Sequence, residues 1–291
     1  MHPRVKAFLL FLLYTIISNA LSPLLAWLFI LKLHVLDTSD RSWRPGAFVW
    51  IESIGAFAAF VATWAVVRVG QRRFGDLGYK RDRALRQLAI GSLFGLTAVV
   101  MLVGGIAALG GFTLGSVTAT GARLAIAWLI AFALVGLAEE MDFRAAGLLT
   151  LAEAIGFWPA AILMSIVFAA LHYFLKPMEN LADVLSVGLL GLFMSYTVLR
   201  TGAIWFALGF HALFDYAAIY LFGAPNSGNN GQPIATKLLS GSYHGPQWLT
   251  GGPLGVEASW LVFPLIALLF LSFSFLYRPL RYNPPQSVQK I

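Results

Sequence analysis

The 291-residue chain contains no cysteine, and only 11% of its residues are charged. The absence of cysteine excludes disulfides, thiolate metal ligands and thiol nucleophiles. The charged fraction is far below the roughly 25% that is typical of soluble domains. Since the chain is also 59% hydrophobic, with a mean hydropathy of +0.77, we predict an integral membrane protein rather than a soluble domain with a large core.

The hydrophobic residues form continuous runs of about 20 residues, the length that a helix needs to cross the hydrocarbon of a bilayer. The runs do not alternate as barrel strands do, so we predict an all-α polytopic transmembrane helix bundle, residues 1–291, as a single domain. We expect about eight spans, at residues 7–31, 47–69, 86–109, 122–143, 158–175, 181–199, 202–222 and 257–277. The fourth helix has room to continue to residue 154, because no helix breaker precedes Gly156.

Basic residues gather between Arg68 and Arg86, beside the ends of two predicted spans. By the positive-inside rule, this cluster orients the chain with both termini in the cytoplasm. The net charge of +7 is then explained by membrane flanks, so the expected partner is the lipid bilayer and not nucleic acid. Residues 223–256 are rich in Gly, Pro and Asn and are predicted to form an extramembrane loop on the opposite side.

Charged residues inside a span are costly and usually functional, and a first group follows the apolar stretch that ends at Leu137. Glu140 and Arg144 are four residues apart, so they share a helix face and are expected to pair. Glu139 lies about 100° around the helix and has no local cation, which makes it the candidate general base. A plain span end, with Glu and Arg at the headgroups, is the alternative explanation.

Two further polar groups occur in later spans. Phe168 and His172 share a helix face, although a single histidine of this kind more often serves a helix contact. His211 and Asp215 are one turn apart, so the carboxylate is expected to orient the imidazole; a purely structural pair is the alternative. Two imidazoles and one or two carboxylates on three helices are the groups that activate water for hydrolysis.

The three segments together resemble the motifs of the CPBP family, the CAAX-protease and bacteriocin-processing (Abi) membrane proteases. These motifs are Glu-Glu-x-x-x-Arg, Phe-x-x-x-His and His-x-x-x-Asn/Asp, each on its own helix. The matching residues are Glu139, Glu140, Arg144, Phe168, His172, His211 and Asp215, within a core of about residues 120–222. The motif arginine is followed here by Ala145, where glycine is frequent in the family, which concerns local packing.

The resemblance implies an intramembrane endopeptidase of a bacterial inner or plasma membrane, acting on a membrane-associated protein or peptide that is prenylated or bacteriocin-like. It implies that Glu139 is the general base and that His172 binds the attacking water or a metal that holds it. His211, held by Asp215, would stabilise the oxyanion or complete a ligand set. Zn²⁺ would need His172, His211 and one of the two glutamates, whereas a metal-free Glu/His mechanism stays open.

The predicted catalytic set is Glu139, Glu140, Arg144, His172, His211 and Asp215. The two glutamates and two histidines are expected to converge in one cavity, with atoms about 4–7 Å apart. The predicted span boundaries set Glu139 and His172 near opposite membrane faces. Convergence therefore requires a longer fourth helix with Glu139 near its middle, or a fifth span that starts deeper.

Two alternatives from other classes stay open. An ion or solute transporter would use the same polar residues, but it predicts ionisable groups at several depths along a path. A non-catalytic immunity or interaction protein would share the fold, although no motif position is degraded here. Glu52 and Asp183 are further acids in or beside spans, and we expect both in helix contacts or at the membrane interface.

Overall fold

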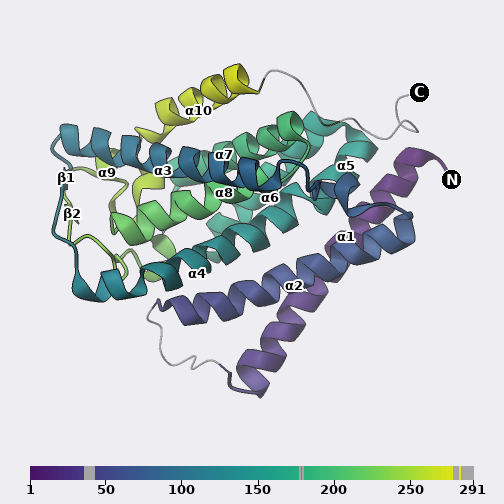
Figure 1. The fold of residues 1–291 in the computed structure, drawn as a ribbon, viewed down its shortest axis with the longest axis horizontal. Helices are drawn as coiled ribbons and strands as arrows, with labels where there is room; N and C mark the ends of the chain where they lie inside the picture. The colour runs from purple at the N-terminus through teal and green to yellow at the C-terminus, as the bar shows by residue number, and fades with distance from the viewer. Residues whose placement is uncertain (36–42, 177, 179, 278–281, 283–291) are drawn as a thin grey trace.

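The structure is a computed structural model that describes residues 1–35, 43–176, 178, 180–277 and 282. Nearly all regular structure in these residues is helical, which confirms the predicted class (Figure 1). The elements are α1 (Pro3–Ala26), α2 (Pro45–Gly70), α3 (Ala84–Ala108), β1 (Phe112–Thr113), α4 (Ala119–Arg144), α5 (Ala146–Ile155), α6 (Phe157–Leu175), α7 (Leu181–Thr201), α8 (Trp205–Asp215), β2 (Ser242–Tyr243), α9 (Gln247–Thr250) and α10 (Val262–Leu276). The C-terminal residues 283–291, predicted to be cytoplasmic, lie outside the described residues.

Six helices of the described chain are long and apolar enough to cross a membrane. They are Pro3–Lys32, Pro45–Gly70, Ala84–Ala108, Ala119–Ile155, Phe157–Leu175 and Leu181–Thr201. The last two predicted spans are also helical, but the helices Trp205–Leu221 and Val262–Leu276 are shorter than this length. Six spans are therefore supported by helix length, and the predicted count of about eight is not confirmed.

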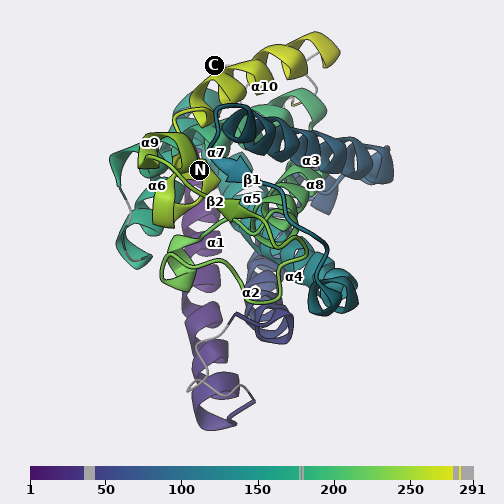
Figure 2. The same ribbon diagram turned by 90° about the vertical axis from the view of Figure 1, so that its left-hand side faces the viewer.

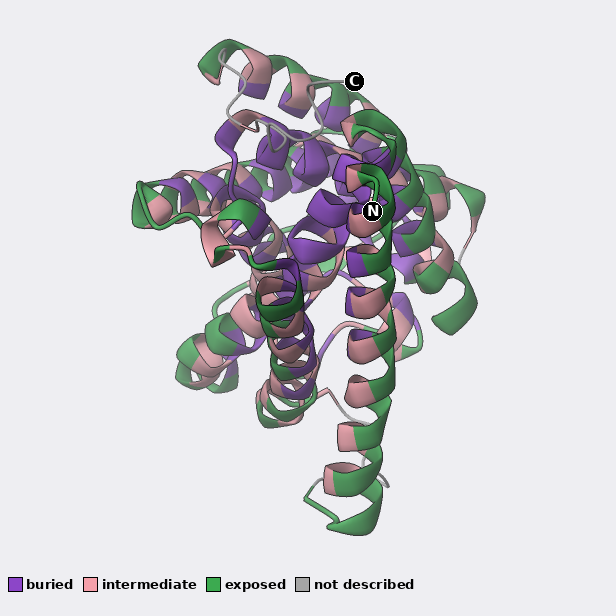
Figure 3. Ribbon diagram, turned by 90° about the vertical axis from the view of Figure 1, so that its right-hand side faces the viewer, coloured by how far each residue is buried: buried purple, intermediate pink, exposed green. Residues whose placement is uncertain are grey.

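The outward faces of the long helices carry large apolar side chains. Ile126 of α4 and Phe174 of α6, for example, are 73% and 78% exposed. Figure 3 shows the buried residues gathered inside the bundle and the exposed ones on its outer faces. Lipid tails accept such a surface, whereas in water so much exposed apolar area would be unfavourable. This arrangement fits an integral membrane protein.

The fourth span is longer than its predicted end at residue 143. α4 and α5 together form one apolar segment, Ala119–Ile155, which is interrupted at Ala145. The amide of residue 145 would normally bond the carbonyl of Met141. Here the Tyr14 hydroxyl of α1 lies 3.0 Å from that carbonyl oxygen and 2.8 Å from Asp142 Oδ1, so it has an acceptor at both. Glu139 consequently lies near the middle of the extended segment, which meets the first of the two conditions for convergence.

Small residues let α8 enter the middle of the bundle, beside α3 and α4 (Figures 1 and 2). A Cβ atom at Gly91 or Gly95 of α3 would come within 2.1 or 2.2 Å of the carbonyl oxygen of Phe206 or Phe210. Close backbone approach of this kind is a common way for membrane helices to pack. It sets α8, which ends in a motif, between its neighbours.

The segment 223–256 is an ordered connection between α8 and α10. Its strand β2 pairs antiparallel with β1, with Phe112 opposite Tyr243 and Thr113 opposite Ser242. The segment also forms α9 and covers one end of the bundle (Figure 2). The predicted loop is therefore largely irregular but folded back onto the protein; its position outside the membrane stays a prediction.

Candidate active site

A cavity of about 220 Å³ lies inside the bundle, lined by residues of α2, α4, α6, α7 and α8. Glu139, His172 and His211, from three different helices, all line it. Asp215 lines it as well. Glu140 departs from the predicted convergence, because it is 0% exposed and does not line the cavity. The three motifs therefore meet at this cavity. Glu139 faces the cavity, whereas Glu140 is buried among the surrounding side chains.

Glu140 connects two motifs through a single oxygen atom. Its Oε1 accepts a hydrogen bond from Arg144 Nη1 over 3.1 Å, which is the predicted pair. The same oxygen lies 2.9 Å from Nδ1 of His211. This second contact joins α4 to α8 and was not predicted from the sequence, because it depends on how the two helices pack.

Arg144 is 1% exposed, so its charge needs partners inside the protein. Its guanidinium carbon lies 4.4 Å from the ring centroid of Phe168, a cation–π contact. The Phe168 ring in turn packs against His172, with centroids 4.5 Å apart. Phe168 therefore has a physical role in the second motif: it separates the buried arginine from the imidazole that faces the cavity.

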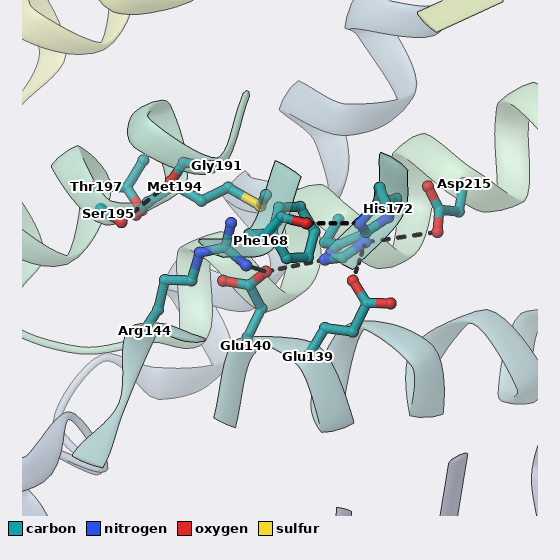
Figure 4. A network of polar contacts seen from close by, with 11 residues as sticks. Glu139, Glu140, Arg144, Phe168, His172, Gly191, Met194, Ser195, Thr197 and Asp215 are labelled. Atoms are coloured by element: carbon teal, nitrogen blue, oxygen red, sulfur yellow. Dashed lines mark hydrogen bonds and ion pairs between the residues drawn. The ribbon is translucent and has the colours of Figure 1, made fainter. Parts of the chain in front are cut away.

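The orientation of His172 follows from its own helix. Its Nδ1 lies 2.9 Å from the carbonyl oxygen of Phe168 (Figure 4). A carbonyl oxygen only accepts hydrogen bonds, so the proton of the neutral ring lies on Nδ1. The other nitrogen, Nε2, then carries a lone pair. His172 is thereby prepared to accept a hydrogen bond or to act as a ligand.

His211 is surrounded by carboxylates. Its Nε2 lies 3.5 Å from Asp215 Oδ2 and 3.6 Å from Glu139 Oε2, while Nδ1 faces Glu140. The predicted approach of Asp215 from one turn away is confirmed, but the closest carboxylate is Glu140. Three acidic neighbours favour the doubly protonated ring, in which both nitrogens donate.

Three residues near the site were missed or misjudged in the sequence. Glu52 of α2 was expected in a helix contact or at the interface, yet it lines the cavity. Lys176, which follows α6, and Glu257 line it too. Their types alone gave no signal, because nothing in the local pattern shows which side of the bundle a residue faces. Asp183 is buried near the start of α7 and does not line the cavity.

Space for the buried arginine comes from Gly191 of α7. A Cβ atom there would lie 2.8 Å from Arg144 Nη2, a distance that would force the guanidinium to move. A glycine in an apolar helix gives no functional signal by itself. Its role becomes visible only once α7 is packed against α4.

The predicted Zn²⁺ site requires His172, His211 and one of the two glutamates as ligands. Within the described residues, no group of three or more His, Cys, Asp or Glu side chains is arranged to hold a metal ion. Both ring nitrogens of His211 face carboxylates, and Glu140 is engaged by Arg144, which leaves His172 Nε2 as the available imidazole donor. The present arrangement therefore does not fit a three-ligand site, and no step below involves a metal.

The comparisons with known proteins concern the same region. The family model described as type II CAAX prenyl endopeptidase Rce1-like matches residues 120–217. No curated protein and no solved structure matches the chain. The matched segment contains all three motifs and ends two residues after Asp215. The predicted resemblance is confirmed for this part of the chain: residues 120–217 match the model of the Rce1-like family of CAAX prenyl endopeptidases.

Proposed function

We propose that this protein is an intramembrane endopeptidase that hydrolyses a peptide bond with water activated by Glu139 and His172. One observation carries the proposal: Glu139, His172 and His211, on α4, α6 and α8, line one cavity inside an apolar bundle. Burial in an apolar setting strengthens each electrostatic contact with a reacting group. The family match supports peptidase chemistry at the level of the family.

The attacking water is held by two acceptors. One of its protons faces the Glu139 carboxylate, and the other faces the lone pair on His172 Nε2, since Nδ1 of that ring is bound to Phe168. A water held in this way presents an oxygen lone pair to the substrate carbonyl. Glu139 takes the proton as the C–O bond forms, which is general-base catalysis.

His211 stabilises the negative charge that develops on the carbonyl oxygen. Its ring is held by Glu140 at Nδ1, so the Nε2–H side is directed toward Glu139, Asp215 and the cavity. An N–H that points to the position of the developing oxyanion stabilises the transition state more than the bound substrate, so it lowers the barrier. Glu139 then returns the proton to the amide nitrogen, the C–N bond breaks, and the new carboxylic acid gives its proton to the amine, so a carboxylate and an ammonium leave.

The substrate is proposed to be a membrane-associated protein or peptide, either prenylated or bacteriocin-like, reached from the bilayer of a bacterial plasma membrane. The family description names prenyl endopeptidases, which favours the prenylated class. The apolar residues that line the cavity beside the motif groups, such as Phe132, Leu190 and Phe214, are compatible with an apolar substrate segment.

Comparative proteomics of a strain that carries Glu139→Ala tests the proposal in the cell. A membrane peptide that persists uncleaved in the variant and is cleaved by the purified wild-type chain would support it. An unchanged peptide profile, together with no cleavage of a peptide library by the purified chain, would contradict it. Those results would favour the transporter or the non-catalytic interaction protein. Elemental analysis of the purified chain and its activity after chelation test whether Zn²⁺ is bound and needed.

A further inference from the structure

The two ends of the helix bundle carry very different charge. Residues 68–86, which span the connection from α2 to α3, contain seven basic and two acidic residues. The turn between α7 and α8 packs against this segment, since the amide of Ile204 donates to the carbonyl of Gly78 over 3.0 Å. The start of α1 lies there too, because Lys6 Nζ donates to the carbonyl of Gly70 over 3.4 Å (Figure 1). We call this side of the bundle the basic end.

The opposite side, which we call the loop end, is formed by residues 109–118 and 223–256. The two segments pair through β1 and β2, and the amide of Thr118 donates to the carbonyl of Leu238 over 2.8 Å. Residues 109–118 contain no charged residue, and Lys237 is the only lysine or arginine in residues 223–256. By the positive-inside rule, this difference predicts that the basic end lies in the cytoplasm and the loop end lies outside it.

The motif cavity lies toward the loop end. Trp43, just before α2, and Lys176, just after α6, line it together with Asn226 of the loop end. These three residues are partly exposed. α8 begins at the basic end, and its last residue, Asp215, also lines the cavity. None of residues 68–86 lines it. The proposed catalytic groups are therefore reached from the loop end.

Packed apolar side chains close the bundle between the motif cavity and the basic end. Ala145, Val198 and Ile204 are 0% exposed and belong to one buried cluster. They come from the break after α4, from α7 and from the start of α8, and each lies nearer the basic end than the cavity-lining residues of its segment. A close-packed apolar layer leaves no room for a polar peptide segment and no partners for its backbone. Access from the basic end is therefore blocked.

We propose that the substrate reaches this site from the extracytoplasmic side, so that the hydrolysed bond lies in an exported segment of a membrane-bound protein or peptide. The inference rests on the proposed peptidase function and adds the side from which the substrate enters. A cysteine with a lipid anchor in the cytoplasmic leaflet would hold its peptide bond at the basic end, across the buried apolar layer. Of the two proposed substrate classes, the geometry therefore favours an exported, bacteriocin-like peptide.

The chain contains no cysteine, so single cysteines report on each end without further substitutions. Gln232→Cys places one at an exposed position of the loop end, and Asp82→Cys is the matched variant at the basic end. A membrane-impermeant maleimide, added to spheroplasts that contain the full-length chain, should label Gln232→Cys. It should label Asp82→Cys only after the membrane is disrupted. The reverse pattern, or equal labelling of the two variants in intact spheroplasts, would overturn the proposal.

Lys176→Cys tests whether the loop end is the entrance. A bulky maleimide on this cysteine should abolish cleavage of a peptide library by the purified chain, whereas the same adduct on Asp82→Cys should leave the wild-type rate. Asn226→Cys, a second lining position, repeats the measurement if Lys176→Cys is itself inactive. Unchanged cleavage by the adducts at both lining positions would overturn the proposal. If the unmodified chain cleaves no peptide but the labelling pattern is as expected, the proposed function fails and the orientation of the cavity stands.

Discussion

Glu139 and Glu140 are consecutive residues of α4, but their surroundings differ sharply. Glu139 lines the cavity, 3.6 Å from His211, whereas Glu140 is fully buried between Arg144 and His211. A carboxylate that faces a cavity can exchange protons with a substrate. A carboxylate that is buried and paired inside the protein, as Glu140 is through Oε1, holds other groups in place. One turn of α4 therefore supplies both the proposed reacting group and the buried carboxylate that holds His211 and Arg144.

The largest effect is expected on the cavity side. Glu139→Gln keeps the shape but removes the base, so cleavage by the purified chain should fall about 10²–10⁴-fold. Thermal unfolding should stay close to wild type, because Glu139 is not part of the buried pair. Asp82→Asn, a change in the exposed turn before α3, serves as the control with wild-type rates. Wild-type cleavage by Glu139→Gln would assign the base to another residue.

A change at the buried Glu140–Arg144 pair should lower the stability of the fold. Arg144→Ala leaves the Glu140 carboxylate without its cation, which should destabilise the fold by about 3–5 kcal/mol. The measurement is the thermal unfolding and yield of the detergent-purified chain. The double variant Arg144→Ala/Glu140→Gln removes the unpaired charge and should recover part of the loss. If Arg144→Ala is as stable as wild type, the pair has no supporting role.

Gly191→Ala should have a smaller effect of the same kind. The added methyl group would lie 2.8 Å from Arg144 Nη2, and overpacking of this type costs about 1–3 kcal/mol. Gly188→Ala on the same helix is the matched control, because its Cβ would meet Ala169 at an ordinary 3.4 Å. If the two variants unfold at the same temperature, the guanidinium is not tightly packed against Gly191.

The smallest effect is expected for Asp215→Asn. Asp215 is 3.5 Å from His211 Nε2, while Glu140 holds the other nitrogen at 2.9 Å. An amide oxygen still accepts the imidazole proton, so kcat/KM should fall by less than about tenfold. A loss as large as that of Glu139→Gln would show that Asp215 takes part in proton transfer. Asp215 would then be a reacting carboxylate like Glu139 and not a supporting one.

Contacts within one helix were predictable, and contacts between helices were not. The spacing of four residues predicted both the Glu140–Arg144 pair and the approach of Asp215 to His211, and both are present. The contact of Glu140 with His211 joins α4 to α8, so no local pattern contains it. Glu52 was misplaced for the same reason: its type is visible in the sequence, but the face of α2 that meets the cavity is not.

The sequence alone determined the membrane character, the helical class and the identity of the motif residues, because composition and local spacing are sufficient for these. Tertiary structure decided which carboxylate faces the cavity. It also decided how far the fourth segment extends beyond its predicted end, since α4 and α5 together reach Ile155. Each of these features arises from packing between segments distant in the chain, where burial and geometry, rather than residue type, set the outcome.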